Sequence, residues 1–314
     1  MDRQTENKII LIVRRTRLDE LIARFNTADQ ARFYIEHLGA DFSDYVTEDR
    51  IYKNAVQEAE RILTKLGRLQ IVDRTFVSNF LFGEKDTVVV LGQDGLVANV
   101  LKYLTTQVVI GVNPDPIRWE GILLPFRVGN LYHVVPDVFG QKRAVKEVTM
   151  AKVTLNTGET LYGVNDLFIG PKTHTSARYS IRFGDRIETH SSSGIIVSTG
   201  LGATGWFRGI ITGATGISAS LTSKAGAIAL QDYDHFSWNS DYLFFMVREP
   251  WPSKTSSAGI IFGKITPDTP LNLVSQMPEN GVIFSDGIEA DFIKFDSGAC
   301  ATVSIAEKKG RLAT

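Results

Sequence analysis

The pattern of apolar and polar residues changes character near residue 127. Before it, short runs of β-branched residues alternate with helical patterns. Strands are predicted at residues 9–13, 69–72, 87–91 and 108–112, and helices at residues 47–66, ended by Gly67, and 96–104. Strand–helix alternation of this kind predicts an α/β domain, residues 1–127, built on a parallel sheet. Ligands of such sheets bind beyond the carboxyl ends of the strands.

From residue 128 onward the chain is rich in Thr, Val, Ile, Tyr and Gly, and its apolar runs are short and separated by turn residues. Strands are expected at residues 151–155, 179–183, 194–198, 227–230, 243–247, 259–265, 281–284 and 292–295, with one helix near residues 204–211. This spacing predicts a mainly antiparallel β domain over residues 128–314. The prediction leaves open that its C-terminal end packs back on the first domain.

Composition narrows the class of protein. The 314 residues carry a formal net charge of −1, which lacks the basic footprint of a nucleic-acid binder. Cys300 is the single cysteine, so an intramolecular disulfide and a thiol-rich metal site are excluded. No apolar run approaches the ~18 residues of a membrane helix, and the polar start lacks a secretory signal. We therefore expect a soluble, cytoplasmic protein without a membrane partner.

Several catalytic and metal motifs are missing from the sequence. The histidines are scattered, without an i, i+4 pair, at positions His37, His133, His174, His190 and His235. A dedicated zinc site is therefore not expected. The sequence has no Gly-x-Ser-x-Gly elbow and no Walker-type phosphate loop.

The most informative segment runs from residue 86 to residue 100. A β-branched strand ends in Gly92-Gln93-Asp94-Gly95, and a helical pattern follows at once. Such a turn can direct backbone N–H groups at a phosphate and present the Asp94 carboxylate at the strand's carboxyl end. The same arrangement also serves as a plain strand-to-helix corner in which Asp94 caps the helix. A second candidate segment begins with Asn113, at the end of the next predicted strand.

Residues 200–205 form a literal Gly-x-Gly-x-x-Gly after a predicted strand, the fingerprint of a Rossmann dinucleotide site. It lies in the β-rich part, and the nearest acidic residue, Asp232, comes too late for the ribose contact. Two interpretations stay open: a tight corner, or a backbone approach to a nucleotide aided by the Thr199 and Thr204 hydroxyls.

Asn165-Asp166 interrupts a strand-like run. Together the two side chains offer donors and acceptors suited to a ribose diol or an adenine edge, and a turn or β-bulge is the structural alternative. Residues 285–287, Ser-Asp-Gly, are predicted to form a hairpin turn, and residues 191–194 another turn.

Taken in order, these motifs resemble the NAD kinase family. Gly92-Gln-Asp-Gly-Leu96 stands where that family has Gly-Gly-Asp-Gly-Thr, and Asn165-Asp166 stands at its Asn-Glu position. Residues 193–199 and 200–206 are similar to its Asp-Gly-x-x-x-Ser-Thr and Pro-x-Gly-x-Thr-Ala-Tyr segments. Residues 110–116, 165–170 and Ser193 are most similar to the mitochondrial type.

The resemblance implies an α/β nucleotide domain followed by a β-sandwich-like domain, with ATP and NAD meeting in the cleft between them. It implies that Asp94 orients or deprotonates the adenosine-ribose 2′-hydroxyl of NAD, which is phosphorylated to NADP. It also implies Mg²⁺ bound with ATP, no other metal, and a homodimer or homotetramer. The residues implied for ATP are Gly92, Gln93, Gly95 and Asn113, and those for NAD are Asn165, Asp166, Ser193, Thr199, Thr204 and Gly205.

Three alternatives remain at this point. Gln93 and Leu96 stand where the family has Gly and Thr, which favours a degenerate NAD(P)-binding sensor without kinase activity. A lipid or sugar kinase with a similar turn is another alternative. A dinucleotide oxidoreductase requires a parallel strand before Gly200.

Overall fold

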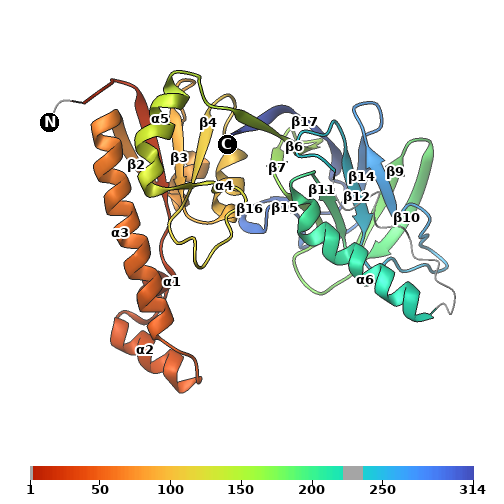
Figure 1. Cartoon of the computed structure of the whole chain (residues 1–314). Helices are drawn as coiled ribbons and strands as arrows, with labels where there is room; N and C mark the ends of the chain where they lie inside the picture. Colours follow the sequence, from red (N-terminus) through yellow and green to blue (C-terminus); the bar gives the residue numbers. More distant parts are fainter. Residues whose placement is uncertain (1–2, 222–235) are drawn as a thin grey trace. The chain divides into compact units, whose positions relative to one another are not determined.

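The computed structural model describes residues 3–221 and 236–314, which form two compact units (Figure 1). The first unit comprises Met1–Lys146 and Arg311–Thr314, and the second comprises Glu147–Gly310. The strand predicted at residues 227–230, His235 and Asp232 lie outside the described residues.

The first unit contains the predicted parallel sheet. Its order is β2-β1-β3-β4, and every neighbouring pair is parallel. The strands are β1 (Lys8–Val13), β2 (Arg68–Asp73), β3 (Thr87–Leu91) and β4 (Val108–Asn113). β5 (Phe126–Arg127) and the end of β17 (Cys300–Ala313) also pair with β4 in parallel. β3 is buried throughout, as its unbroken β-branched run predicts.

Two helices cover one face of this sheet. α3 (Ser43–Leu66) and α5 (Leu131–Phe139) share a hydrophobic core with alternate residues of β1, β3 and β4. Because α5 contributes Leu131, Val134 and Val135 to that core, the first unit extends past residue 127, where its end was expected, to Lys146. α4 (Asp94–Leu101) connects β3 to β4, shorter than the predicted helix at residues 96–104.

Two helices without a counterpart in the predictions precede α3. α1 (Arg17–Phe25) is capped by Thr16, which forms a reciprocal capping box with Asp19, and α2 (Ala28–His37) is capped by Thr27. They pack in a small apolar cluster with Phe42. Two 3₁₀ segments, η1 (Arg74–Asn79) and η2 (Val128–Asn130), complete the unit.

Gly67 ends α3, as predicted, but not in the left-handed conformation usual after helices. Its φ is −168°, which is extended backbone open to any residue. A Cβ atom there would lie 2.4 Å from the Asn7 carbonyl oxygen. Glycine is therefore needed at this position for close approach of two backbones rather than for positive φ.

The second unit contains antiparallel strands in two sheets, with a core that contains side chains from both. One sheet has the order β13-β12-β11-β8-β15-β16. These strands are β8 (Asp166–Pro171), β11 (Ile195–Ser198), β12 (Leu243–Val247), β13 (Phe262–Ile265), β15 (Gly281–Ser285) and β16 (Ile288–Lys294). The other contains β6 (Val145–Leu155), β7 (Thr160–Gly163), β9 (Ala177–Phe183), β10 (Arg186–Ser192), β14 (Leu271–Ser275) and much of β17. The predicted antiparallel, sandwich-like fold is confirmed.

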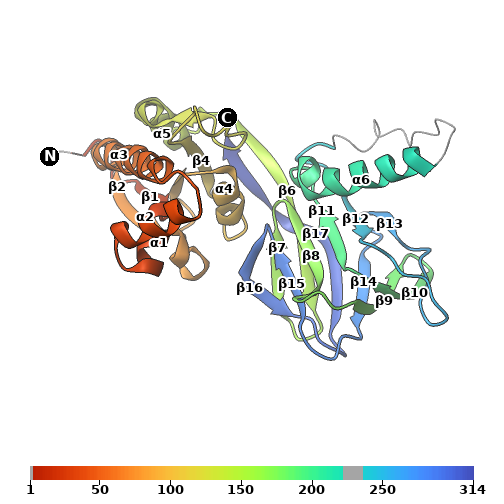
Figure 2. The same ribbon diagram turned by 90° about the horizontal axis from the view of Figure 1, so that it is seen from below.

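One helix lies on the outer face of the β8-containing sheet. α6 (Trp206–Leu221) follows the short 3₁₀ turn η3 (Gly202–Thr204) and packs near β11 (Figure 2). Phe207 anchors α6 in a second apolar cluster with Phe168 and Phe244. The helix predicted near residues 204–211 therefore exists and is longer than expected.

Candidate functional site

The turn between β3 and α4 has a relaxed backbone. Gln93 is the N-cap of α4, with φ −117° and ψ 163°, and its side chain makes no capping hydrogen bond. Gln93 therefore occupies the position of a family glycine without the strain that positive φ would impose. Asp94 is the first helical residue and not the N-cap. The alternative in which Asp94 only caps the helix at a strand-to-helix corner is therefore wrong.

Asp94 uses one carboxylate oxygen to hold the chain and leaves the other available. Its Oδ1 accepts a hydrogen bond from the Leu123 N–H at 2.7 Å, and the residue is half-buried. Within the described residues no hydrogen bond reaches Oδ2. Gly95 beside it is exposed, and a Cβ there would meet nothing within 4 Å. Leu96 is buried, with Cδ2 2.8 Å from where a Cβ of Gly92 would stand. The turn is thus open at Gly95. Beneath it, the buried Leu96 side chain packs against Gly92 and forms the apolar base of the turn.

Asn113 orders the loop that follows β4. Its side-chain Nδ2 donates to the Trp119 carbonyl at 2.9 Å, and its Oδ1 accepts from the Asp115 N–H at 3.0 Å. The residue is buried, and both its amide nitrogen and its amide oxygen are hydrogen-bonded within the chain. Its direct contribution is to shape the loop that ends at Leu123, the partner of Asp94.

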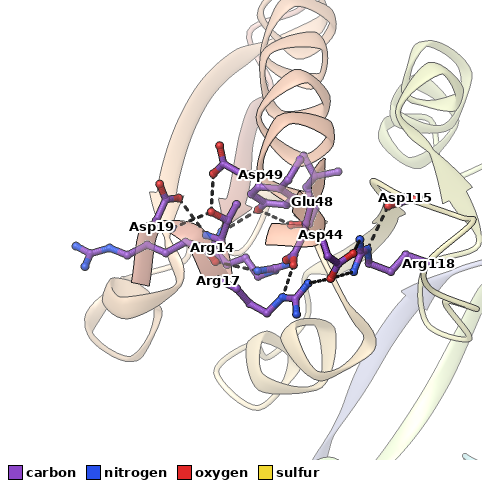
Figure 3. A network of polar contacts seen from close by, with 12 residues as sticks. Arg14, Arg17, Asp19, Asp44, Glu48, Asp49, Asp115 and Arg118 are labelled. Carbon is purple, nitrogen blue, oxygen red and sulfur yellow. Dashed lines mark hydrogen bonds and ion pairs between the residues drawn. The ribbon is translucent and has the colours of Figure 1, made fainter. Parts of the chain in front are cut away.

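A network of ion pairs holds that loop against the helices (Figure 3). Arg118, in the loop, donates to Asp44 at 2.5 and 3.1 Å, and Arg17 of α1 donates to the same carboxylate at 2.7 Å. Arg17 also contacts Glu48 of α3, which accepts from Arg14 at 2.9 Å. The network therefore connects the residues that follow β1 and β4, both at the carboxyl edge of the sheet where ligands bind.

Electrostatics favour the ionised form of this network. The Arg118 guanidinium, followed by that of Arg17, holds the pKa of Asp44 well below its usual range. Burial opposes ionisation of Glu48, but hydrogen bonds from Arg14 and Arg17 outweigh it and lower its pKa. Sequence analysis did not identify these residues, although Thr16 with Asp19 carries a capping-box pattern that predicts the start of α1.

In the second unit, Asn165 and Asp166 lie at the bend between β7 and β8. The hairpin turn that contains Asp286 holds this bend, because the Asp286 carboxylate accepts backbone N–H groups of Asn165 at 2.6 Å, Val164 at 3.0 Å and Asp166 at 3.3 Å. Asp286 itself has φ +55°, a conformation that Asp tolerates better than most residues. The predicted turn is present, and its contact with the Asn165–Asp166 bend is the feature that sequence analysis missed.

Asp166 is a buried carboxyl group, 9% exposed. Burial raises its pKa from the ordinary 3.8 to about 7, and the nearby negative charge of Asp286 adds to the rise. Among the described residues no side chain donates a hydrogen bond to the Asp166 carboxyl group. A buried acceptor of this kind is suited to a hydroxyl donor from a ligand.

We expect the stability of the protein to depend on pH through Asp166. Between about pH 4 and pH 7 the unfolded chain ionises Asp166 while the folded chain keeps it protonated, so the free energy of unfolding falls as pH rises. A shift of this size corresponds to at most about 4 kcal/mol. Asp166→Asn removes this dependence. As pH rises through that range, the free energy of unfolding of the variant should therefore increase relative to that of the wild type, as measured by urea unfolding.

The exposed Asp185→Asn, in the turn between β9 and β10, is the matched control and should leave the pH profile unchanged. A constant difference between wild type and Asp166→Asn from pH 4 to pH 8 contradicts the prediction.

The glycine-rich segment packs on the same bend. A Cβ at Gly202 would lie 2.0 Å from the Asn165 carbonyl oxygen, and the buried Thr199 hydroxyl donates to the Val164 carbonyl at 2.6 Å. Thr204 and Gly205 are exposed at the end of η3. β11, which precedes Gly200, is antiparallel to both of its neighbours, which excludes a Rossmann unit and the oxidoreductase alternative.

We expect Gly202→Ala to destabilise the protein by at least about 2 kcal/mol, because the added methyl group overlaps the Asn165 carbonyl and forces the bend to move. Gly205→Ala is the control from the same motif, since its Cβ would meet only the Gly202 oxygen, at 3.4 Å. Chemical denaturation of both variants measures the difference, and equal stabilities contradict the close-approach argument.

A cavity of about 330 Å³ opens on the face of the sheet that carries α6. Ser193 lines it, together with aromatic rings, two cationic side chains and an imidazole: Phe168, Trp206, Phe284, Phe292, Lys172, Arg248 and His174. Asp166 and Phe168 are two residues apart on β8, so their side chains lie on the same face of the sheet. The structure thus places Ser193 in a cavity that has Phe168 in its wall. Phe168 in turn lies on the same face of β8 as Asp166.

Solved structures resemble this architecture over nearly the whole chain. An NAD kinase from Archaeoglobus fulgidus in complex with ATP superposes with a TM-score of 0.57 and 13% identity, covering 98% of this chain and 93% of that one. Yeast NADH kinase complexed with NADH gives a TM-score of 0.58 and 14% identity, covering 99% and 84%. The chain has the NAD kinase fold.

Sequence comparison points the same way over part of the chain. NAD kinase 2 of Geobacillus kaustophilus is 24% identical over 133 residues, 41% of this chain. That match spans about half, 49%, of the relative's length. No protein-family model matches the sequence.

Within residues 3–221 and 236–314, no helix is long and apolar enough to cross a membrane. The same residues contain no group of three or more His, Cys, Asp or Glu side chains placed to hold a metal ion.

Proposed function

We propose that this protein is an NAD kinase-family phosphotransferase that uses ATP to phosphorylate the adenosine-ribose 2′-hydroxyl of NAD. The observation that carries the proposal is the geometry of Asp94. Its carboxylate stands at the carboxyl end of β3 and is fixed through Oδ1 by the Leu123 N–H. Oδ2 has no hydrogen-bond partner in the described part of the chain and can accept a proton or a hydrogen bond from a hydroxyl. The fold shared with kinases solved with ATP and NADH supports it.

ATP is proposed to bind at the turn after β3. Gly95 leaves space for a phosphate, Gly92 and Gln93 form the approach, and α4 directs its N-terminal N–H groups there. Asn113 acts by shaping the neighbouring loop. Mg²⁺ would bind together with ATP and would neutralise part of the triphosphate charge beside the Asp94 carboxylate.

NAD is proposed to bind at the Asn165–Asp166 bend. Asp166 lacks a partner from the described side chains and can accept hydrogen bonds from a ribose diol, beside the half-exposed amide of Asn165. Ser193, Thr204 and Gly205 are proposed to line the way to the NAD site. The Thr199 hydroxyl instead donates hydrogen bonds to the backbone carbonyls of the bend and so supports it. The chain's own residues thus supply orientation, which phosphoryl transfer needs more than covalent chemistry.

The direct test is NADP formation from NAD and ATP with Mg²⁺, measured by a coupled dehydrogenase assay. We expect turnover that depends on all three components. No product with any nucleoside triphosphate or with inorganic polyphosphate contradicts the proposed activity.

One observation favours a second candidate, the NAD(P)-binding sensor. Leu96 is buried in the apolar base of the turn, so the first turn of α4 lacks the hydroxyl that the family's Thr would place there. Calorimetry separates the two functions: tight NAD(P) binding without detectable ATP–Mg²⁺ binding supports the sensor.

The resemblance of residues 110–116, 165–170 and Ser193 leads us to place the chain nearest the mitochondrial type of NAD kinase. By the same resemblance we propose a homodimer or homotetramer. Light scattering of the purified protein tests the oligomeric state.

A further inference from the structure

A second cavity lies at the amino ends of the parallel strands, within the first unit. Its volume is about 610 Å³, and all of its described lining residues belong to that unit. Among them, Asn7, Thr87 and Val108 stand at or just before the first residues of β1, β3 and β4. Asp94 and Asn113 lie at the opposite ends of these strands, about 15 Å away along the sheet. The cavity is therefore separate from the proposed site of phosphoryl transfer.

Three cationic side chains line this cavity. Lys85 belongs to the turn before β3, Arg143 to the segment between α5 and β6, and Arg311 to the returning end of β17. In the part of the chain that the structure describes, no carboxylate forms an ion pair with any of them. Arg143 and Arg311 are nevertheless half-buried, as is Arg118 of the same unit, which is paired with Asp44. The cavity thus gathers positive charge that the protein itself does not neutralise.

Backbone carbonyl groups hold the two arginines in place. The Nη1 atom of Arg311 donates to the Thr106 carbonyl at 2.8 Å, and the Nε atom of Arg143 donates to the Thr314 carbonyl at 2.7 Å. The Arg143 guanidinium also lies 4.8 Å from the Phe126 ring centre. A guanidinium has five N–H donors, so both arginines keep donors for a ligand. Because both side chains are already anchored, a ligand has little conformational freedom left to remove from them.

The acidic groups at this cavity do not cancel its positive charge. Asp86 is one of them, but its Oδ2 atom accepts the Gly83 N–H at 2.9 Å and lies 3.4 Å from the Lys8 ammonium. Glu84 is the other, and it is exposed, so solvent screens its charge. The carbonyl groups in the last turn of α5 accept N–H groups of residues 140–142, which weakens the negative field of that helix end.

We propose that this cavity binds a small multivalent oxyanion, such as a phosphate ester or a tricarboxylate, between Lys85, Arg143 and Arg311. The guanidinium fork matches the paired oxygens of both phosphate and carboxylate groups. The three cations come from segments far apart in the sequence. A bound anion therefore ties the returning end of β17 to the turn before β3 and stabilises the first unit by mass action. The site is independent of the proposed function.

Thermal unfolding and calorimetric titration of the full-length protein test the proposal. Inorganic pyrophosphate and citrate are the probes, each compared with sodium chloride at equal ionic strength. We expect at least one of the two anions to bind and to raise the melting temperature. Pyrophosphate alone identifies a phosphate ligand, citrate alone identifies a carboxylate ligand, and an effect of both shows that the site recognises oxyanion charge.

Two variants show whether the anion binds in this cavity. Lys85→Gln removes an exposed cation that has no ion pair to lose, so it should fold normally and bind the anion roughly threefold more weakly. Arg311→Gln should weaken binding about tenfold, because it removes charged donors that are half-buried. Lys142→Gln is the control, since this exposed lysine stands next to Arg143 but lies outside the lining, and it should bind the anion as the wild type does.

The inference is overturned if neither anion stabilises the protein beyond the effect of chloride. It is also overturned if either Lys85→Gln or Arg311→Gln binds the anion as tightly as the wild type does, because the anion then lies elsewhere, for example at the turn after β3. Lys85→Gln should leave NADP formation unchanged, since Lys85 lies at the amino end of the sheet. Failure of this inference therefore leaves the proposed function intact.

Discussion

Asp94→Asn is expected to lower kcat/KM for NADP formation by roughly a thousandfold. The amide oxygen of Asn can still accept the Leu123 N–H, so the turn and the loop after β4 keep their geometry. The variant loses the negatively charged carboxylate, which is the group that takes up the proton of the hydroxyl. A positioned general base contributes a factor of about 10²–10⁴ to the rate. Initial rates at saturating ATP and Mg²⁺ measure the effect.

Two observations complete this test. The melting temperature of Asp94→Asn should stay close to that of the wild type, which separates lost chemistry from lost folding. Asp94→Ala also loses the hydrogen bond to Leu123, so it should be both inactive and less stable. Turnover of Asp94→Asn within a factor of three of the wild type contradicts the catalytic role of Asp94.

Asp286→Ala is expected to destabilise the protein by roughly 3–6 kcal/mol and to abolish measurable dinucleotide binding. Removing the carboxylate leaves the N–H groups of Val164, Asn165 and Asp166 without their acceptor, and each such group costs about 1–3 kcal/mol. Alanine also tolerates φ +55° poorly. Urea unfolding and calorimetry with NADH measure the two effects.

Asp286→Asn is the matched variant for that prediction. Asn tolerates positive φ and keeps one oxygen acceptor, so it should retain most of the stability. It also removes the negative charge that helps raise the pKa of Asp166, which should move the pH dependence of stability to lower pH. If Asp286→Ala binds NADH as the wild type does, Asp286 does not position the bend.

Much of the fold could be predicted from the sequence because strongly periodic segments dominate it. The fully buried strand before Gly92 is an unbroken β-branched run, and the parallel sheet of the first unit follows from its alternation with helices. The helices at Arg17–Phe25 and Ala28–His37 were missed because they are short, although Thr16 with Asp19 marks the start of the first. α5 was missed because an internal Pro136 interrupts its pattern.

The candidate site was predictable only as motifs. Local sequence marks Asp94 and Asn165-Asp166 as polar groups at the ends of apolar runs. It does not show that Asp94 bonds to Leu123, or that Asp286, far along the chain, holds the bend before β8. Those contacts depend on which strands become neighbours, and strand pairing is a property of the whole fold.

The return of Arg311–Thr314 to the first unit has a consequence for biosynthesis. Arg311 and Leu312 pair with Val108 and Val109 of β4, and Ala313 joins the core beneath α3. The first unit therefore cannot finish its sheet until those residues have left the ribosome, after the whole second unit has been translated. Its folding includes contacts of very long sequence separation, which slow folding. Nascent chains arrested before Arg311 should be cleaved readily by protease in the first unit.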